Sequence, residues 1–153
     1  GRTDVGFLFV GRGSDAQRLR DDARARALDN VVFRDEIHPD EIPNLYAQCH
    51  IGLVALDPRH RTHNIPGKFL TYMQSGLPVL ASVNAGNDLV GLIEQERVGR
   101  AVTDASAESL ARAAVELVDA VSSDDGFAKR CKALSARLFS AETAVRQIVS
   151  ALA

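Results

Sequence analysis

The sequence lacks tryptophan altogether and contains few other aromatic residues or cysteines. It has two tyrosines, six phenylalanines and two cysteines among 153 residues. Cys49 and Cys131 form no CxxC pair and have no histidines at metal-ligand spacing, so neither a zinc site nor a disulfide scaffold is indicated. The N-terminal residues also lack the charged-then-apolar pattern of a secretion signal. We therefore expect a reduced, cytoplasmic setting.

Neither charge sign is in excess, and long apolar runs are missing. The formal net charge is -2, so no basic field is available to attract nucleic acid. No uninterrupted apolar run approaches the ~18 residues of a membrane span. The composition, with 46% hydrophobic and 25% charged residues, is ordinary for a soluble globular protein. The length suits one folded domain, which we expect to span residues 1–153.

What the sequence does contain is a regular alternation of short apolar runs and helical patterns. Ser14 and Gln17 fit a capping box that opens the first helix, and Pro43 places the start of the second helix near Ile42. The expected strands are 5–11, 30–35, 50–56, 78–82 and 99–104, each followed by a helix, with further helices at 124–139 and 140–153. This alternation predicts an α/β fold with a Rossmann-like, doubly wound parallel sheet, whose ligands bind at the carboxyl ends of the strands.

Two loops after strands have weak functional signals. The segment GRGSD, Gly11 to Asp15, lacks the third glycine of a dinucleotide fingerprint, and no GxxxxGK[ST] motif occurs. Its glycines are typical of a tight turn into a helix. The charges of FRDEIHPDE, residues 33–41, form either a solvated surface or the edge of a ligand site.

The segment HNIPGKFL, residues 63–70, has a stronger signal. Pro66 suits a helix start, Gly67 allows a ligand close to the backbone, and Lys68 adds a positive charge. The free N–H groups of such a helix start bind anions, so a phosphate site competes here with a plain helix start and a solvated lysine. His63 precedes this start and could hydrogen-bond a sugar or a phosphate. A metal would need a third ligand, and Asp57 is the only nearby carboxylate, so no metal is expected.

These segments together resemble a known family. The runs VGFLFVGRGSD, FRDEIHPDEIPNLYAQC, NIPGKFLTYMQSGLPVLAS and VGRAVTD are similar, in this order, to the carboxyl-terminal half of a GT-B-fold group 1 retaining glycosyltransferase. The resemblance covers nearly the whole chain and is nearest to bacterial enzymes of lipopolysaccharide O-antigen and capsule assembly. It implies a nucleotide-sugar donor, expected to be a UDP-sugar, and no cofactor or metal.

The resemblance also implies partners and a location. The protein's own amino-terminal half would bind the acceptor, a glycan or a lipid-linked molecule. Because such acceptors are often lipid-linked, the enzyme is expected in the cytoplasm, peripherally at the inner face of the membrane. No basic amphipathic patch that would hold a membrane stands out in the sequence.

Carried over by residue, the resemblance assigns roles around the donor. Thr71 stands where the family usually has a glutamate that holds the ribose, and His63 where another glutamate often lies near the donor sugar. Asp35 replaces the usual glycine of the loop that borders the base. His63 and Lys68 are the expected catalytic residues. The residues expected to bind the donor are Arg34, Asp35, Glu36, Ile37, Asn64, Ile65, Pro66, Gly67 and Thr71.

The family's domain begins with a further strand and helix, which lie before this chain. If the family's strand order holds, that strand belongs between the first and third strands present here. Unpaired strand edges favour association, so this fragment is expected either to form a homodimer or to close the gap within its own sheet. The fragment alone should bind nucleotide weakly and should not catalyse.

Three other functions compete with a glycosyltransferase donor half. A sugar-nucleotide epimerase of similar architecture would need acid and base residues around the sugar, where the usual carboxylates are replaced. A non-catalytic module with a degenerate site is favoured by these replacements and disfavoured by the retained Pro66-Gly67-Lys68 start. A receiver domain is imitated by Asp15 and Asp57, but the glycine-rich first loop does not fit.

Overall fold

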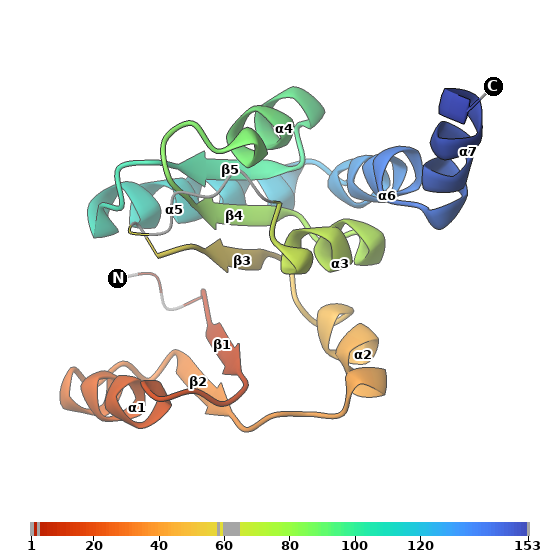
Figure 1. The fold of residues 1–153 in the computed structure, drawn as a ribbon. Helices are drawn as coiled ribbons and strands as arrows, with labels where there is room; N and C mark the ends of the chain where they lie inside the picture. The colour runs from red at the N-terminus through yellow and green to blue at the C-terminus, as the bar shows by residue number, and fades with distance from the viewer. Residues whose placement is uncertain (1, 3, 58, 60–64, 153) are drawn as a thin grey trace. The chain divides into compact units, whose positions relative to one another are not determined.

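A computed structural model describes residues 2, 4–57, 59 and 65–152, and the chain divides into two compact units, residues 1–42 and 43–153. All pairings between strands are parallel, and they form a two-stranded sheet in the first unit and a three-stranded sheet in the second (Figure 1). The predicted α/β class with parallel sheets and covering helices is confirmed. The prediction of one domain over residues 1–153 stays a prediction.

The first unit is a single β-α-β motif. It contains β1 (Phe7–Val10), α1 (Ala16–Ala25), β2 (Val31–Arg34) and the 3-10 helix η1 (Pro39–Glu41). β1 pairs with β2, and the ring of Phe9 stacks on that of Phe33 with centroids 5.2 Å apart. None of the described residues in this unit is buried. The unit therefore has apolar contacts but no enclosed core.

The expected capping box at Ser14 and Gln17 is wrong. The chain is already helical at Asp15, which is the N-cap residue of α1 and makes no side-chain capping bond. The Gln17 amide donates instead to Asp21, one turn along the helix surface, at 2.9 Å. A capping box does form before η1, where His38 and Glu41 bond reciprocally to backbone N–H groups.

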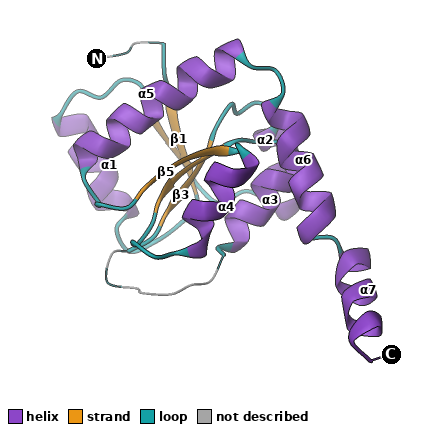
Figure 2. Cartoon of the chain, turned by 90° about the horizontal axis from the view of Figure 1, so that it is seen from above, coloured by secondary structure: helices purple, strands orange, loops and turns teal. Residues whose placement is uncertain are grey.

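The second unit is a three-layer arrangement with strand order β3-β4-β5 (Figure 2). It begins within α2 (Ile42–Tyr46), whose start at Ile42 is as predicted, and continues through the following elements: β3 (Gly52–Ala55), α3 (Gly67–Ser75), β4 (Val79–Ser82), α4 (Asp88–Glu96), β5 (Gly99–Val102), α5 (Ala107–Ser123), α6 (Phe127–Leu138) and α7 (Ala141–Leu152).

The two faces of the central strand β4 contribute side chains to two separate apolar clusters. Val79 and Ala81 contribute to a cluster with residues of α3, α4 and α6, whereas Leu80 contributes to a cluster with α5. Side chains alternate between the faces of a strand, so helices must cover both sides. This is the doubly wound arrangement that the apolar runs predict.

A close contact fixes α3 against β3. The ring of Tyr72 lies over Gly52, where a Cβ atom would come within 2.6 Å of the ring. Tyr72 also meets Tyr46 edge to face, with ring centroids 5.1 Å apart, and its hydroxyl donates to the Leu53 carbonyl at 3.4 Å. Burial raises the pKa of the Tyr72 phenol to about 12. Tyr72, in the middle of α3, thus holds this helix against the sheet.

Candidate functional site

The start of α3 is the best-defined part of the predicted donor site. Pro66 is the N-cap residue, in an extended conformation, and makes no side-chain capping bond. Its carbonyl accepts the N–H of Phe69 at 2.9 Å. The N–H groups that precede Phe69 have no acceptor within the helix, because the first turn of any helix leaves its donors free. No hydrogen bond joins them to another described residue, so they can meet an anion, with the positive end of the helix dipole behind them.

Gly67 and Lys68 leave this helix start open. Both residues are exposed, and no atom lies within 4 Å of a Cβ atom built on Gly67. Packing within the described residues therefore does not require a glycine here. Lys68 forms no ion pair with any described residue, so its ammonium group is available to a ligand. Its neighbour Phe69 is fully buried and anchors the turn in the core.

Two further predicted residues flank this start. Ile65 is half-buried and packs against the apolar cluster of α3, α4 and α6. Thr71 lies one turn after Lys68, is exposed, and its hydroxyl donates to the Lys68 carbonyl at 3.0 Å. The Thr71 oxygen keeps lone pairs that can accept a hydrogen bond, but one hydroxyl cannot accept two ribose hydroxyls as a carboxylate does.

The predicted base loop belongs to the first unit. Arg34 ends β2, and its carbonyl accepts the N–H of Gly11 at 3.2 Å, so the loops after β1 and β2 lie side by side. Asp35 and Glu36 are exposed, while Ile37 is half-buried. These carboxylates lie at the carboxyl ends of the parallel pair, where Rossmann-like sheets bind ligands.

Two arginines that the sequence did not single out hold this loop. Arg12 pairs with Glu36 at 2.9 Å, and Arg20 pairs with Asp35 at 2.9 Å and lies 6.0 Å from the centre of the Phe33 ring. Gly11, with φ 138°, supplies the turn that brings the Arg12 loop to this position. No spacing rule could have found these pairs, because each joins the loop to a separate segment of the β-α-β motif.

The remaining predicted residues, His63 and Asn64, lie outside the described residues. Ile65, Pro66, Gly67, Lys68 and Thr71 come together at one helix start in the second unit, whereas Arg34 to Ile37 belong to the first. Within the part of the chain that the structure describes, no three His, Cys, Asp or Glu side chains are grouped to share a metal ion.

Comparison with known proteins adds the deciding observation. A family model described as glycosyl transferases group 1 matches residues 1–120, from before β1 into α5. The chain belongs to this glycosyltransferase family. A search of curated proteins found no match.

The group 1 glycosyltransferase match covers both parts of the predicted site and every described strand. Glycosyltransferases move a sugar from an activated donor to an acceptor, so this domain has a donor and an acceptor as its partners in general. Helices α6 and α7 lie beyond the matched residues. Among the described helices, none has the length and apolar composition needed to cross a membrane.

Proposed function

We propose that this chain is the C-terminal, donor-binding half of a retaining glycosyltransferase. It binds a nucleotide diphosphate sugar, expected to be a UDP-sugar, for transfer to a glycan or lipid-linked acceptor in bacterial lipopolysaccharide assembly. The acceptor is bound by the protein's own amino-terminal half, in the cytoplasm. The observation that carries this proposal is the uncapped, open start of α3 at Pro66, Gly67 and Lys68.

The chemistry of the donor explains why such a helix start suits the reaction. Breaking the bond between the donor's anomeric carbon and the phosphate oxygen leaves a nucleoside diphosphate with an additional negative charge. The free N–H groups of Gly67 and Lys68 and the Lys68 ammonium can stabilise that charge as it develops. Ile65 and Phe69 hold the turn in place from the apolar side. Thr71 accepts a hydrogen bond from the ribose, and the loop from Arg34 to Ile37 borders the base.

An NMR titration of the chain with UDP, GDP and ADP, and then with UDP-sugars, tests this proposal. We expect shifts centred on residues 65–71 and 34–37, with UDP preferred. Lys68→Gln should weaken binding at least about tenfold, because it removes a charge-assisted contact to phosphate. Lys129→Gln, at an exposed lysine of α6, is the matched control and should leave binding unchanged.

The variant Gly67→Ala tests whether the ligand approaches the backbone at Gly67, because it should change nucleotide binding without weakening the fold. Because a Cβ atom has open space at Gly67, this variant should be at least as stable as the wild type, yet it should bind nucleotide more weakly. The absence of NMR shifts at millimolar nucleotide would contradict a donor site at α3. So would shifts that are the same in Lys68→Gln and Gly67→Ala as in the wild type.

Thr71 favours a second candidate, a degenerate nucleotide-binding module without catalysis. Its hydroxyl already bonds to the Lys68 carbonyl, and no carboxylate is available at this position to hold the ribose. Nucleotide binding that does not distinguish a UDP-sugar from UDP would favour this module. An epimerase of similar architecture would instead convert a UDP-sugar in the absence of any acceptor.

A further inference from the structure

The loop after β2 places two carboxylates where an anionic ligand is expected. Asp35 and Glu36 follow the last residue of β2 directly, and both are exposed. A nucleoside diphosphate is itself an anion, so an unpaired carboxylate beside it would repel it over the screening distance of about 10 Å. A donor site that includes this loop therefore needs cations that balance the two carboxylates.

Arg20 reaches Asp35 from the middle of α1. Its Nη2 atom donates a hydrogen bond to Oδ1 of Asp35 at 2.9 Å, across 15 residues of chain. The guanidinium carbon lies 6.0 Å from the centre of the Phe33 ring, and that ring stacks on the ring of Phe9. The Arg20 side chain is only 26% exposed. It is thus held at two points, by the aromatic pair of the strands and by the carboxylate of the loop.

The other paired arginines of α1 form only local contacts. Arg18 and Arg24 pair with carboxylates three or four residues away, along the surface of their own helix. Arg20 pairs instead with a carboxylate in the loop after β2. Ion pairs with an exposed partner contribute little to the free energy of unfolding, so the main effect of this pair is on the position and charge of Asp35.

We propose that Arg20 is a positioning residue for donor binding. It holds the Asp35 carboxylate toward α1 and balances its charge, so that the loop after β2 accepts the base of an anionic nucleotide. Arg20 acts through Asp35 and does not itself touch the ligand. Arg12 balances the second carboxylate, Glu36, but its side chain is 86% exposed and therefore less well held. This inference rests on the proposed donor site.

UDP affinity in matched variants, measured by NMR titration, tests this role. Arg20→Gln should weaken binding at least about threefold, because the charge of Asp35 is no longer balanced, and added salt should reduce this loss. Arg20→Lys keeps the positive charge and should retain most of the affinity. Arg24→Gln is the control, since Arg24 lies one turn further along α1 and pairs with Asp21 at 3.8 Å. Its affinity should equal that of the wild type. Amide shifts of β1 and β2 without nucleotide verify that each variant folds.

A double-variant comparison distinguishes positioning from a direct or a structural role of Arg20. Asp35→Asn keeps the size of the side chain and removes its charge, so adding Arg20→Gln to it should change the affinity less than about 1.5-fold. A loss as large as in the wild-type background overturns the proposal, because Arg20 would then act independently of Asp35. Equal affinities of Arg20→Gln and the wild type also overturn it, and both outcomes leave the donor site intact. A wild type that shows no shifts with UDP contradicts the donor site and this role together.

Discussion

Gly99 lies so close to the neighbouring strand that a side chain has no room there. A Cβ atom at this position would overlap the carbonyl oxygen of Val79, its partner in the β4–β5 pairing. The obstacle is backbone, which cannot move aside as the end of a flexible side chain can. Gly99 is therefore a packing requirement of the sheet, unlike Gly67, which has open space around it.

We predict that Gly99→Ala lowers the free energy of unfolding by about 3 kcal/mol or more, because either the strands separate or the backbone shifts. Urea unfolding measures this change. Gly91→Ala is the control, because Gly91 lies inside α4 with nothing within 4 Å of a Cβ atom. That substitution should be neutral or stabilising by about 0.5–1 kcal/mol. Equal midpoints for the two variants would refute the steric argument.

Residue identity predicted some site features and missed others. The helix start at Pro66, Gly67 and Lys68 could be predicted because its chemistry is local, within one turn of chain. The pairs Arg12–Glu36 and Arg20–Asp35 could not, since they depend on how the β-α-β motif closes. The capping box at Ser14 failed for a related reason, because the backbone at Asp15 is already helical when the chain leaves the loop.

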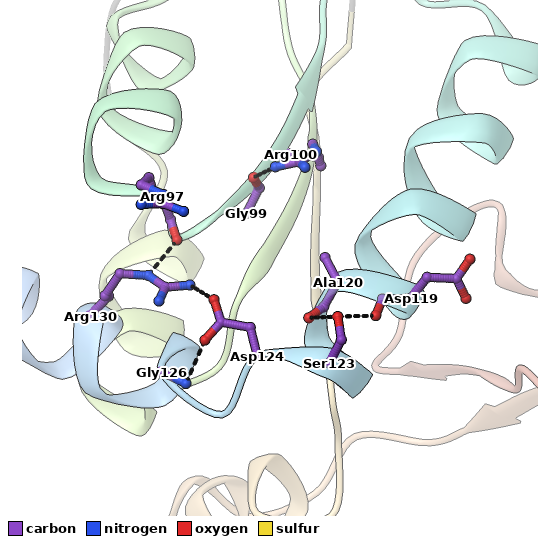
Figure 3. Close-up of polar contacts among 9 residues, drawn as sticks. All are labelled: Arg97, Gly99, Arg100, Asp119, Ala120, Ser123, Asp124, Gly126 and Arg130. Atoms are coloured by element: carbon purple, nitrogen blue, oxygen red, sulfur yellow. Dashed lines mark hydrogen bonds and ion pairs between the residues drawn. The ribbon is translucent and has the colours of Figure 1, made fainter.

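At the scale of elements, the turn between α5 and α6 is fixed by a compact set of polar contacts (Figure 3). Asp124 accepts the N–H of Gly126 at 2.8 Å and the Arg130 guanidinium at 2.8 Å. Arg130 also donates to the carbonyl of Arg97 at 2.9 Å and lies 4.4 Å from the centre of the Phe127 ring. These contacts join the end of α4 to the start of α6. The bond from Arg130, then that from Gly126, lowers the pKa of Asp124.

We expect Asp124→Asn to be less stable than the wild type at neutral pH, and we expect this difference to become smaller as the pH falls. A carboxyl group whose pKa is lowered by folding stabilises the protein above its unfolded pKa, and this contribution is lost as the pH falls through its folded pKa. The amide keeps the bond to Gly126 but loses the ion pair. Urea unfolding at about pH 7 and about pH 3 measures the difference.

Asp125→Asn is the control for that experiment. Asp125 is the next residue, exposed, and forms no ion pair with the described residues. Its substitution should leave the unfolding curve nearly unchanged at both pH values. A difference in stability between Asp124→Asn and the wild type that is as large in acid as at neutral pH would show that the ion pair is not its source.

Strand and helix positions were largely predictable, because periodicity is a property of the element itself. All five expected strands form, each shorter than its apolar run, and α2 begins at Ile42 as Pro43 required. Periodicity could not show whether another part of the protein covers the apolar face of a helix. The apolar residues of α5 and α7 have the same pattern, yet Leu117 of α5 is fully buried and Val149 of α7 is exposed.

At the scale of the whole molecule, the two units differ in how much apolar surface they enclose. The second unit has two buried clusters, whereas Phe7, Leu8 and Phe9 of β1 each remain more than 40% exposed. About 40 residues is near the lower limit for a unit that folds unaided. The division into units could not be predicted from the sequence, because both have the same alternation of strand and helix.

We predict that the amides of β2 exchange with solvent much faster than those of β4. Local opening is easiest where few apolar contacts are lost, and β4 is buried between two layers of helices while β2 is not. Hydrogen exchange followed by NMR compares the two strands in one sample. Similar protection factors would mean that the chain opens as one cooperative body.

The contact between Tyr46 and Tyr72 has a consequence for how this protein can be observed. The chain contains no tryptophan and only these two tyrosines, and their rings meet in the second unit. The absorption, dichroism and fluorescence bands of tyrosine therefore all originate in one contact between α2 and α3. A melting curve recorded at the tyrosine bands follows the surroundings of that contact alone, and the β1–β2 pair could separate earlier without changing this signal. A tryptophan introduced at Phe33 would give the first unit a chromophore of its own.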